Sequence, residues 1–266
     1  SKIDAQITDW LKISNNTSFF KSSYEYMGNG TSSLFSNVRV HLLPSIVPYN
    51  PDGTFVYRAP GVSGTYIPGN GEPSLLFNNK NTNFDDDYTL STTFEAVLTP
   101  IKHLTITANY SYSQRQLTNA SRSATVPYSQ TPGVVEYRTD VQNQLMEKVN
   151  REWYQAANAF ANYENTFAGA HHLSVTGGLN YETRLYKNLR VLRDGLISDV
   201  LSDFDLAKGD RYELSGGKYR YALFGLFYRV NYDWKNRYLF EASGRYDGSS
   251  RFARGHRYGF FPSFSA

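Results

Sequence analysis

The chain has 266 residues, of which 16% are aromatic, and its mean hydropathy is −0.51. Its formal net charge of +3 is mild, without the clustered basic charge of a nucleic-acid-binding protein, so we expect no nucleic acid partner. The absence of Cys excludes disulfide frameworks, thiol catalysis and thiolate metal sites. No segment approaches the ~20 apolar residues of a membrane helix.

The ends of the sequence indicate a piece of a longer protein. The chain opens with SKIDAQITDW, shows no signal peptide, and stops at FPSFSA inside a strand pattern. No domain boundary is visible, so we expect residues 1–266 to form one partial domain.

Alternation of apolar and polar residues predicts strands that come in pairs. In chain order, the pairs surround short turns at 8–12, 99–103, 167–171 and 233–236. Ten consecutive alternating positions at 104–113 are typical of a strand and not of a helix. The sequence therefore predicts an all-β fold, an antiparallel up-and-down meander of about nine strands with the last one cut off.

The connections between the pairs are long and the strands are predicted to be about 11 residues each. The connections cover 27–87, 118–152 and 187–220 and hold most of the Pro, Gly, Asn and Asp residues. One segment, 139–153, could hold a helical turn. Short turns at one end and long loops at the other make the meander asymmetric.

The two faces of each strand differ, which raises the question of which one meets water. From 222 to 232 one face is apolar, and the other face here and on the following strand offers Arg229, Asn231, Arg237, Glu241, Ser243 and Arg245. A soluble β-fold would turn the apolar face inward, whereas a membrane barrel would turn it to lipid and line its lumen with the polar face. Strand length favours the membrane barrel, as does the placement of Trp10 and Trp234 in Asp-Trp turns, where we predict interfacial positions. The residues predicted to face the lumen are Arg229, Asn231, Arg237, Glu241 and Arg245.

No catalytic or metal-binding constellation emerges. The serines of DGSSRF (247–252) follow an Asp-Gly pair that is typical of a turn, and the G-x-S-x-G motif of a hydrolase nucleophile is absent. The three carboxylates of FDDDY (84–88) could supply calcium ligands, but EF-hand spacing is absent and a solvated loop end is expected. No H-x-x-x-H spacing exists, and His171 and His172 should diverge on a strand. We expect no enzyme activity, no cofactor and no metal.

Aromatic residues in the long loops are candidates for stacking on sugar rings, because an exposed Tyr loses little entropy on ordering. The alternative is that they pack to keep a large loop ordered. The candidates are Tyr49, Tyr57, Tyr66, Tyr137 and Tyr212, with Phe55 beside them.

Residues 228–266 resemble the SusC/RagA family of TonB-dependent outer-membrane transporters. The family pattern has a strand ending in NY, a short turn, RYLxxASxRxDGSSRF, and then FPSxSA. The matching residues are Asn231, Tyr232, Arg237, Tyr238, Leu239, Ala242, Ser243, Arg245, Asp247, Gly248, Ser249, Ser250, Arg251, Phe252, Phe261, Pro262, Ser263 and Ala266. Looser similarities extend over nearly the whole chain, with 118–152 the least recognisable part.

The resemblance implies a middle section of a barrel of about 22 strands in the outer membrane of a Gram-negative bacterium, with short periplasmic turns and long extracellular loops. It also implies a SusD-like surface lipoprotein as partner, TonB contact through a plug region that this sequence lacks, and import of glycans or sometimes peptides. The motif residues Asp247, Gly248, Ser249, Ser250, Arg251, Phe252 and Pro262 are expected to be structural. The alternative function is a soluble or surface-attached β-rich module that binds glycan through its loops.

Overall fold

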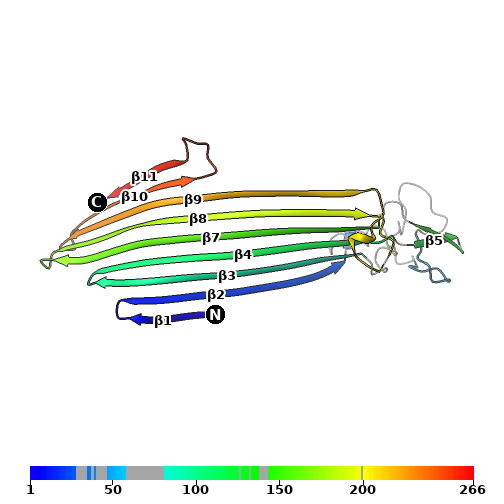
Figure 1. The fold of residues 1–266 in the computed structure, drawn as a ribbon, viewed down its shortest axis with the longest axis horizontal. Helices are drawn as coiled ribbons and strands as arrows, with labels where there is room; N and C mark the ends of the chain where they lie inside the picture. The colour runs from blue at the N-terminus through cyan, green and yellow to red at the C-terminus, as the bar shows by residue number, and fades with distance from the viewer. Residues whose placement is uncertain are drawn as a thin grey trace.

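A computed structural model of the protein describes residues 1–27, 35–36, 39, 47–57, 81–125, 127–131, 133–137, 143–198 and 200–266. Its main feature is a nine-stranded antiparallel sheet in which the order in space follows the order in the chain (Figure 1). This confirms the predicted up-and-down meander. No helix among the described residues is long and apolar enough to cross a membrane, a finding that concerns helices alone.

Most of the regular structure in the described residues lies in the main sheet and a separate two-stranded hairpin. The strands of the main sheet are β1 (Lys2–Thr8), β2 (Leu11–Met27), β3 (Thr82–Ile101), β4 (Leu104–Ser123), β7 (Gln144–Phe167), β8 (His171–Asp194), β9 (Tyr212–Trp234), β10 (Tyr238–Ser249) and β11 (Tyr258–Ser265). The hairpin consists of β5 (Pro127–Thr131) and β6 (Val134–Tyr137), and one short 3₁₀ helix, η1 (Phe204–Leu206), precedes β9.

Short turns lie at one end of the sheet and the long connections at the other (Figure 1). The turn between β3 and β4 is only residues 102–103, and those before β8 and β10 are 168–170 and 235–237. Each contains a residue in the left-handed region, such as His103 with φ 72° and Lys235 with φ 55°. Such values are uncommon for residues other than Gly, and they let the chain reverse within two or three residues. The turns overlap the predicted ones but are tighter.

The central strands β3, β4, β7, β8 and β9 are about twice as long as predicted, so the predicted length was wrong for them. β4 has 20 residues, β8 has 24 and β9 has 23. The apolar alternation ends near 114, 183 and 222, but the inter-strand hydrogen-bond ladder continues beyond it, with polar side chains on the far halves. The predicted connections 27–87, 118–152 and 187–220 were correspondingly too wide.

The predicted helical turn at 139–153 was also wrong wherever the structure describes it. β7 begins at Gln144, and its first residues pair with both neighbours, as Met146 does with Ser121 and Leu192. The neighbouring strands β4 and β8 offer hydrogen-bond partners to the backbone groups of this segment on both sides. These hydrogen bonds outweigh the helical propensity of its Leu, Met, Glu and Lys residues.

Two adjacent rows of residues, each crossing all nine strands, define the two faces of the sheet. In the first, the apolar row, every residue is apolar: Ala5, Ile13, Ala96, Ala108, Ala159, Leu179, Leu226, Tyr246 and Phe260. In the second, the polar row, every residue is polar or Gly: Asp4, Ser14, Glu95, Asn109, Asn158, Asn180, Gly225, Asp247 and Gly259. Because adjacent residues of a strand point to opposite faces, the two rows lie back to back. We call the two sides the apolar face and the polar face.

The apolar face is not covered by other described residues. Leu226 is 44% exposed, Phe94 52% and Phe240 53%. The few buried apolar side chains are small or lie where loops return to the sheet, as in the cluster of Leu145, Leu196 and Ala207. A soluble β-sandwich would bury its apolar face against a second layer, and the described part of this chain has no such layer.

Gly177 and Gly178 provide a test of the register, since they are adjacent and point to opposite faces. A Cβ at Gly178 would lie 2.5 Å from Phe160 Cβ and 2.7 Å from Phe227 Cζ, whereas a Cβ at Gly177 would find nothing nearer than 4.0 Å. We predict that Gly178→Ala lowers the free energy of unfolding by about 1–3 kcal/mol. Gly177→Ala should be neutral or slightly stabilising. Denaturant titration of both variants checks this, and equal effects would contradict the register.

Candidate functional site

The polar face of β9 and β10 brings together four of the five residues predicted to line a lumen. Glu241 lies directly opposite Asn231, and Arg229 opposite Ser243, so these residues share a face with Arg245. Arg229 Nε lies 3.6 Å from Glu241 Oε1. Arg237 differs, because it lies in the turn before β10, where strand alternation does not fix its direction.

Arg245 and Asp247 form a forked ion pair on the same face. Arg245 Nη2 lies 2.9 Å from Asp247 Oδ1, and Arg245 Nε lies 3.1 Å from Oδ2. Both side chains lie over Gly225, where a Cβ would come within 2.6 Å of Asp247 Oδ1. Gly225 therefore lets the pair lie close to the sheet, with donors of Arg245 left for a ligand.

Three phenylalanines lie on the polar face, and the sequence reasoning missed them. Phe160 and Phe227 both lie opposite Gly178, and Phe227 and Phe261 both lie opposite Arg245. The Arg245 Cζ atom is 5.9 Å from the centroid of the Phe227 ring, within the range of a cation–π contact. The sequence already indicated the position of Phe227, because residues two apart in a strand point to the same face and Phe227 is two residues from Arg229.

Two hollows adjoin at Arg245 and Phe261. One, of about 450 Å³, is also lined by Thr176, Phe227 and Arg229. The other, of about 500 Å³, is also lined by Glu182 and Asp247. Both combine aromatic surface with hydrogen-bonding groups, the lining typical of sites that bind a polar organic ligand.

Asparagines of the polar row connect this region to the rest of the face. Asn158 Nδ2 donates to Asn109 Oδ1 at 2.7 Å, and Asn180 Nδ2 donates to Asn158 Oδ1. At the far end Ser14 Oγ donates to Asp4 Oδ1 at 2.6 Å. Cross-strand bonds of this kind stabilise the register and leave a continuous hydrophilic surface.

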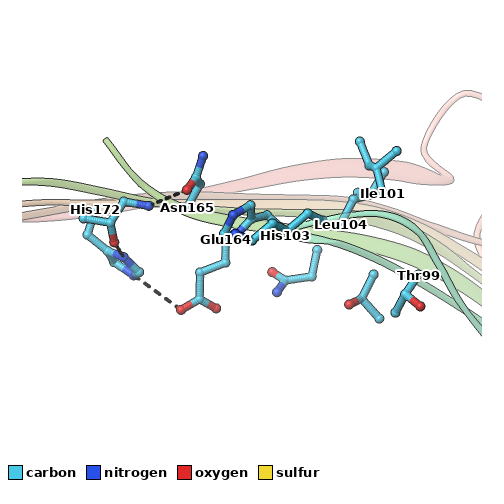
Figure 2. Close-up of a pocket in the computed structure, with 11 residues that line it drawn as sticks. Thr99, Ile101, His103, Leu104, Glu164, Asn165 and His172 are labelled. Atoms are coloured by element: carbon cyan, nitrogen blue, oxygen red, sulfur yellow. Dashed lines mark hydrogen bonds and ion pairs between the residues drawn. The ribbon is translucent and has the colours of Figure 1, made fainter. Parts of the chain in front are cut away.

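A third hollow, of about 840 Å³, lies at the short-turn end (Figure 2). Glu164 and His172 approach each other there, with His172 Nε2 3.5 Å from Glu164 Oε1. His171 lies on the other face, where its Nδ1 is 2.6 Å from the Tyr232 hydroxyl oxygen, so the predicted divergence of the two histidines is confirmed. The hollow is an open groove beside His103, and in it the Thr166 Oγ1 atom lies 3.1 Å from His172 Nδ1.

The tryptophans lie at the two ends of the apolar face. Trp234 ends β9 beside Tyr238, with ring centroids 5.5 Å apart, and Trp10 lies in the β1–β2 turn. Trp153, which the sequence reasoning placed in a helical turn, lies on the apolar face of β7, opposite Leu185. Lys187 Nζ is 5.6 Å from the Trp153 ring centroid.

The DGSSRF motif makes internal contacts. Ser250 Oγ accepts the backbone N–H of Ala222 at 2.8 Å, while the Ser250 N–H donates to the Ala222 carbonyl at 2.9 Å. Arg251 Cζ lies 3.9 Å from the Tyr221 ring centroid. Gly248 faces the Tyr258 ring, and a Cβ there would come within 2.3 Å of it. The remaining motif residues lie at the end of β10 (Asp247, Ser249), in the following loop (Phe252) and opposite Gly244 on β11 (Pro262).

The aspartates of FDDDY lie in β3 and not at a solvated loop end, so that expectation was wrong. Asp86 points to the apolar face near Lys21, with an N–O distance of 3.8 Å. Asp85 and Asp87 point to the polar face, where Asp87 pairs with Arg115 at 2.6 Å. Alternation thus separates the three carboxylates, which do not converge on one point.

The loop aromatics pack in pairs near the hairpin. Tyr49 and Phe55 have ring centroids 5.0 Å apart, and Tyr57 and Tyr128 4.5 Å apart. Hydrogen bonds from Thr54 hold the pKa of the Asp52 carboxyl below its ordinary value and brace the turn between the first pair. The other candidates lie apart: Tyr137 is 58% exposed, Tyr212 is 72% exposed, and Tyr66 lies outside the described residues.

A single antiparallel layer with an uncovered apolar face and an ion-paired polar face is the architecture of a β-barrel wall. A sequence profile for the family described as "TonB dependent receptor-like, beta-barrel" matches residues 11–266, and the chain belongs to this family. The predicted family is confirmed.

Relatives and solved structures agree with this assignment. TonB-dependent receptor P26 of Formosa agariphila is 23% identical over 273 residues, which cover 100% of this chain and 26% of that protein. TonB-dependent receptor SusC of Bacteroides thetaiotaomicron is 50% identical over 46 residues, 17% of this chain and 5% of that protein. A structure of the RagAB peptide transporter matches with a TM-score of 0.73 at 21% identity, over 98% of this chain and 28% of that one. The chain thus spans about a quarter of the length of TonB-dependent receptor P26 and of the matched RagAB chain.

Ser250 offers a test of the motif. We predict that Ser250→Ala lowers the free energy of unfolding by about 1 kcal/mol, because the Ala222 N–H loses its acceptor. Ser263→Ala, on the polar face of β11, is the matched control and should change it by less than about 0.5 kcal/mol. Denaturant titrations compare the two, and a neutral Ser250→Ala would mean that the contact does not hold the start of the β10–β11 loop against β9.

Proposed function

We propose that this chain forms part of the wall of an outer-membrane barrel that actively imports a nutrient, a glycan or a peptide. The observation that carries the proposal is the pair of back-to-back rows, one apolar and one polar, across all nine strands. Lipid would contact the apolar row, and a water-filled lumen the polar row. Family membership supports this orientation.

The dimensions of the apolar face fit a bilayer. On β9 it runs from Tyr232 to Ala222, followed by Arg220 and Lys218. About ten residue steps of ~3.3 Å at a tilt of ~40° give ~25 Å, the height of the apolar band of such barrels. Trp234 and Trp153 bracket this band as interfacial residues do.

The substrate would contact the two adjoining hollows on the polar face. Phe227 and Phe261 offer stacking surfaces, and Arg229 and Arg245 offer donors. Each arginine already has a carboxylate partner, so the surface is close to neutral and suits hydroxyl or amide groups better than charged ones. Glycans and peptides both carry such groups, and RagAB is described as a peptide transporter.

Partners follow from the family and from the length of the relatives. A SusD-like lipoprotein would cover the extracellular loops, and TonB would act through a plug region. We assign neither contact to a residue of this chain. The alternative, a soluble glycan-binding module, needs a cover for the apolar face, and the exposed Leu226 and Phe240 argue against it.

Leu226→Arg tests which face meets lipid. We predict a cost of about 2–4 kcal/mol and less folded protein in the membrane, because Leu226 lies near the middle of the apolar band. Ser174→Arg on the polar face, directly opposite Glu164 and Asn231, is the control and should be tolerated. Heat-modifiable gel migration of outer-membrane fractions measures folded protein, and equal losses for both variants would contradict the orientation.

Phe227→Ala combined with Arg245→Ala tests the import site. We predict about a tenfold loss of uptake of the natural substrate, corresponding to ~1.4 kcal/mol. Tyr228→Phe, a neighbour on the apolar face, should import normally. Uptake is measured at equal amounts of folded protein, with and without a protonophore. Uptake that is unaffected by the double substitution would remove these residues from the substrate path.

A further inference from the structure

Three cations lie side by side on the apolar side of the sheet, just beyond the apolar band. Arg151 of β7 is directly opposite Lys187 of β8, which is directly opposite Lys218 of β9. Arg220 lies two residues closer to the short turns on the same face. All four side chains are exposed. We call Arg151, Lys187 and Lys218 the basic row.

Like charges directly opposite each other on adjacent strands are destabilising, since their Cβ atoms are only ~4.5–5.5 Å apart. None of the three forms an ion pair with a carboxylate of the described residues. The nearest acid on that face of β7, Glu147, lies four residues further from the turns. On the polar face, by contrast, Arg229 and Arg245 each have a carboxylate partner. The basic row thus lacks the carboxylate partners that these two arginines have.

Neutral acceptors hold two of the guanidinium groups in place. Arg151 Nε donates to Gln116 Oε1 at 2.9 Å, and Arg220 Nε donates to Thr183 Oγ1 at 3.4 Å. These bonds use one donor of each group and leave the others without a hydrogen-bond partner among the described residues. The charges are thus positioned but not neutralised, which is the arrangement expected of a site for an anion.

The position of the basic row relative to the lipid-facing band indicates which anion it would bind. Trp153 lies two residues closer to the turns than Arg151, where its ring contacts Lys187 at 5.6 Å. A Trp at the edge of a lipid-facing band lies at the interface, so the basic row lies at the level of the lipid head groups. Cations just outside the hydrocarbon layer attract anionic lipid.

We propose that the basic row binds the phosphate groups of lipid in the outer leaflet. Three cations on adjacent strands span about 10 Å and can contact one or two phosphates at once. Lipid phosphate would offset the repulsion within the row and fix the height of β7–β9 in the bilayer. The inference rests on the membrane orientation proposed above, but not on any substrate.

The test uses the full-length protein purified from the outer membrane in a nonionic detergent. The row variant is Arg151→Gln, Lys187→Gln and Lys218→Gln together. The charge-matched control is Lys102→Gln, Lys208→Gln and Lys235→Gln, which changes exposed residues in connections. Each protein is titrated with a phosphorylated glycolipid, with the same glycolipid after its phosphates are removed, and with inorganic phosphate, and binding is followed by native mass spectrometry and thermal shift.

We expect the wild-type and control proteins to prefer the phosphorylated glycolipid, and the row variant to lose affinity by on the order of 100-fold. Added salt should weaken the preference. Equal binding of the two glycolipids, or equal affinity of row and control variants, would overturn the proposal. Inorganic phosphate that competes at the same concentration would overturn the lipid as ligand.

Failure of this inference is distinguishable from failure of the proposed function. A protein that is absent from the outer-membrane fraction refutes the barrel itself. A protein that inserts and imports, yet does not discriminate between the glycolipids, refutes only the role of the basic row.

Discussion

The constraint on which the structure depends is that a single layer of antiparallel strands must present one face suited to an apolar environment and one face suited to water. Backbone groups are paired within the sheet, so the ladder itself does not require water on either side. Side chains then decide the environment of each face by alternation. Leu226 and Gly225 are neighbours in the chain, yet the first belongs to a row of nine apolar residues and the second to a row of nine polar or Gly residues. A single slip of register would mix the two.

Charge follows the same division. Carboxylates accompany the arginines on the polar face, as Glu241 does Arg229 and Asp87 does Arg115. Cations beyond the apolar band, such as Lys187, have no such partners among the described residues. One set of strands thus presents a nearly neutral surface on the polar face and a positive edge on the apolar side. The first suits the passage of a polar molecule, and the second suits contact with anionic head groups.

The faces and the strand order could be predicted from the sequence because alternation is a local signal, as at 104–113 and 222–232. The strand ends could not, since beyond these segments the strands continue through pairing with neighbours and carry polar residues on both sides. The segment before Trp153 looked helical for the same reason, because its partners are distant in the chain. The alternation of each strand would have been enough to place Phe227 and Phe261 on the polar face. That both lie opposite Arg245 could be seen only from the register of β9, β10 and β11.

The most direct measurement of the central claim is the environment of successive residues along β9 in a membrane. Spin labels placed one at a time from 223 to 231 in the full-length protein can be relaxed by lipid-soluble oxygen or by a water-soluble nickel chelate. The account predicts that labels at 224, 226, 228 and 230 respond to oxygen, and labels at 223, 225, 227, 229 and 231 to the chelate. Labels that respond to the chelate on both faces alike would contradict a lipid-facing wall.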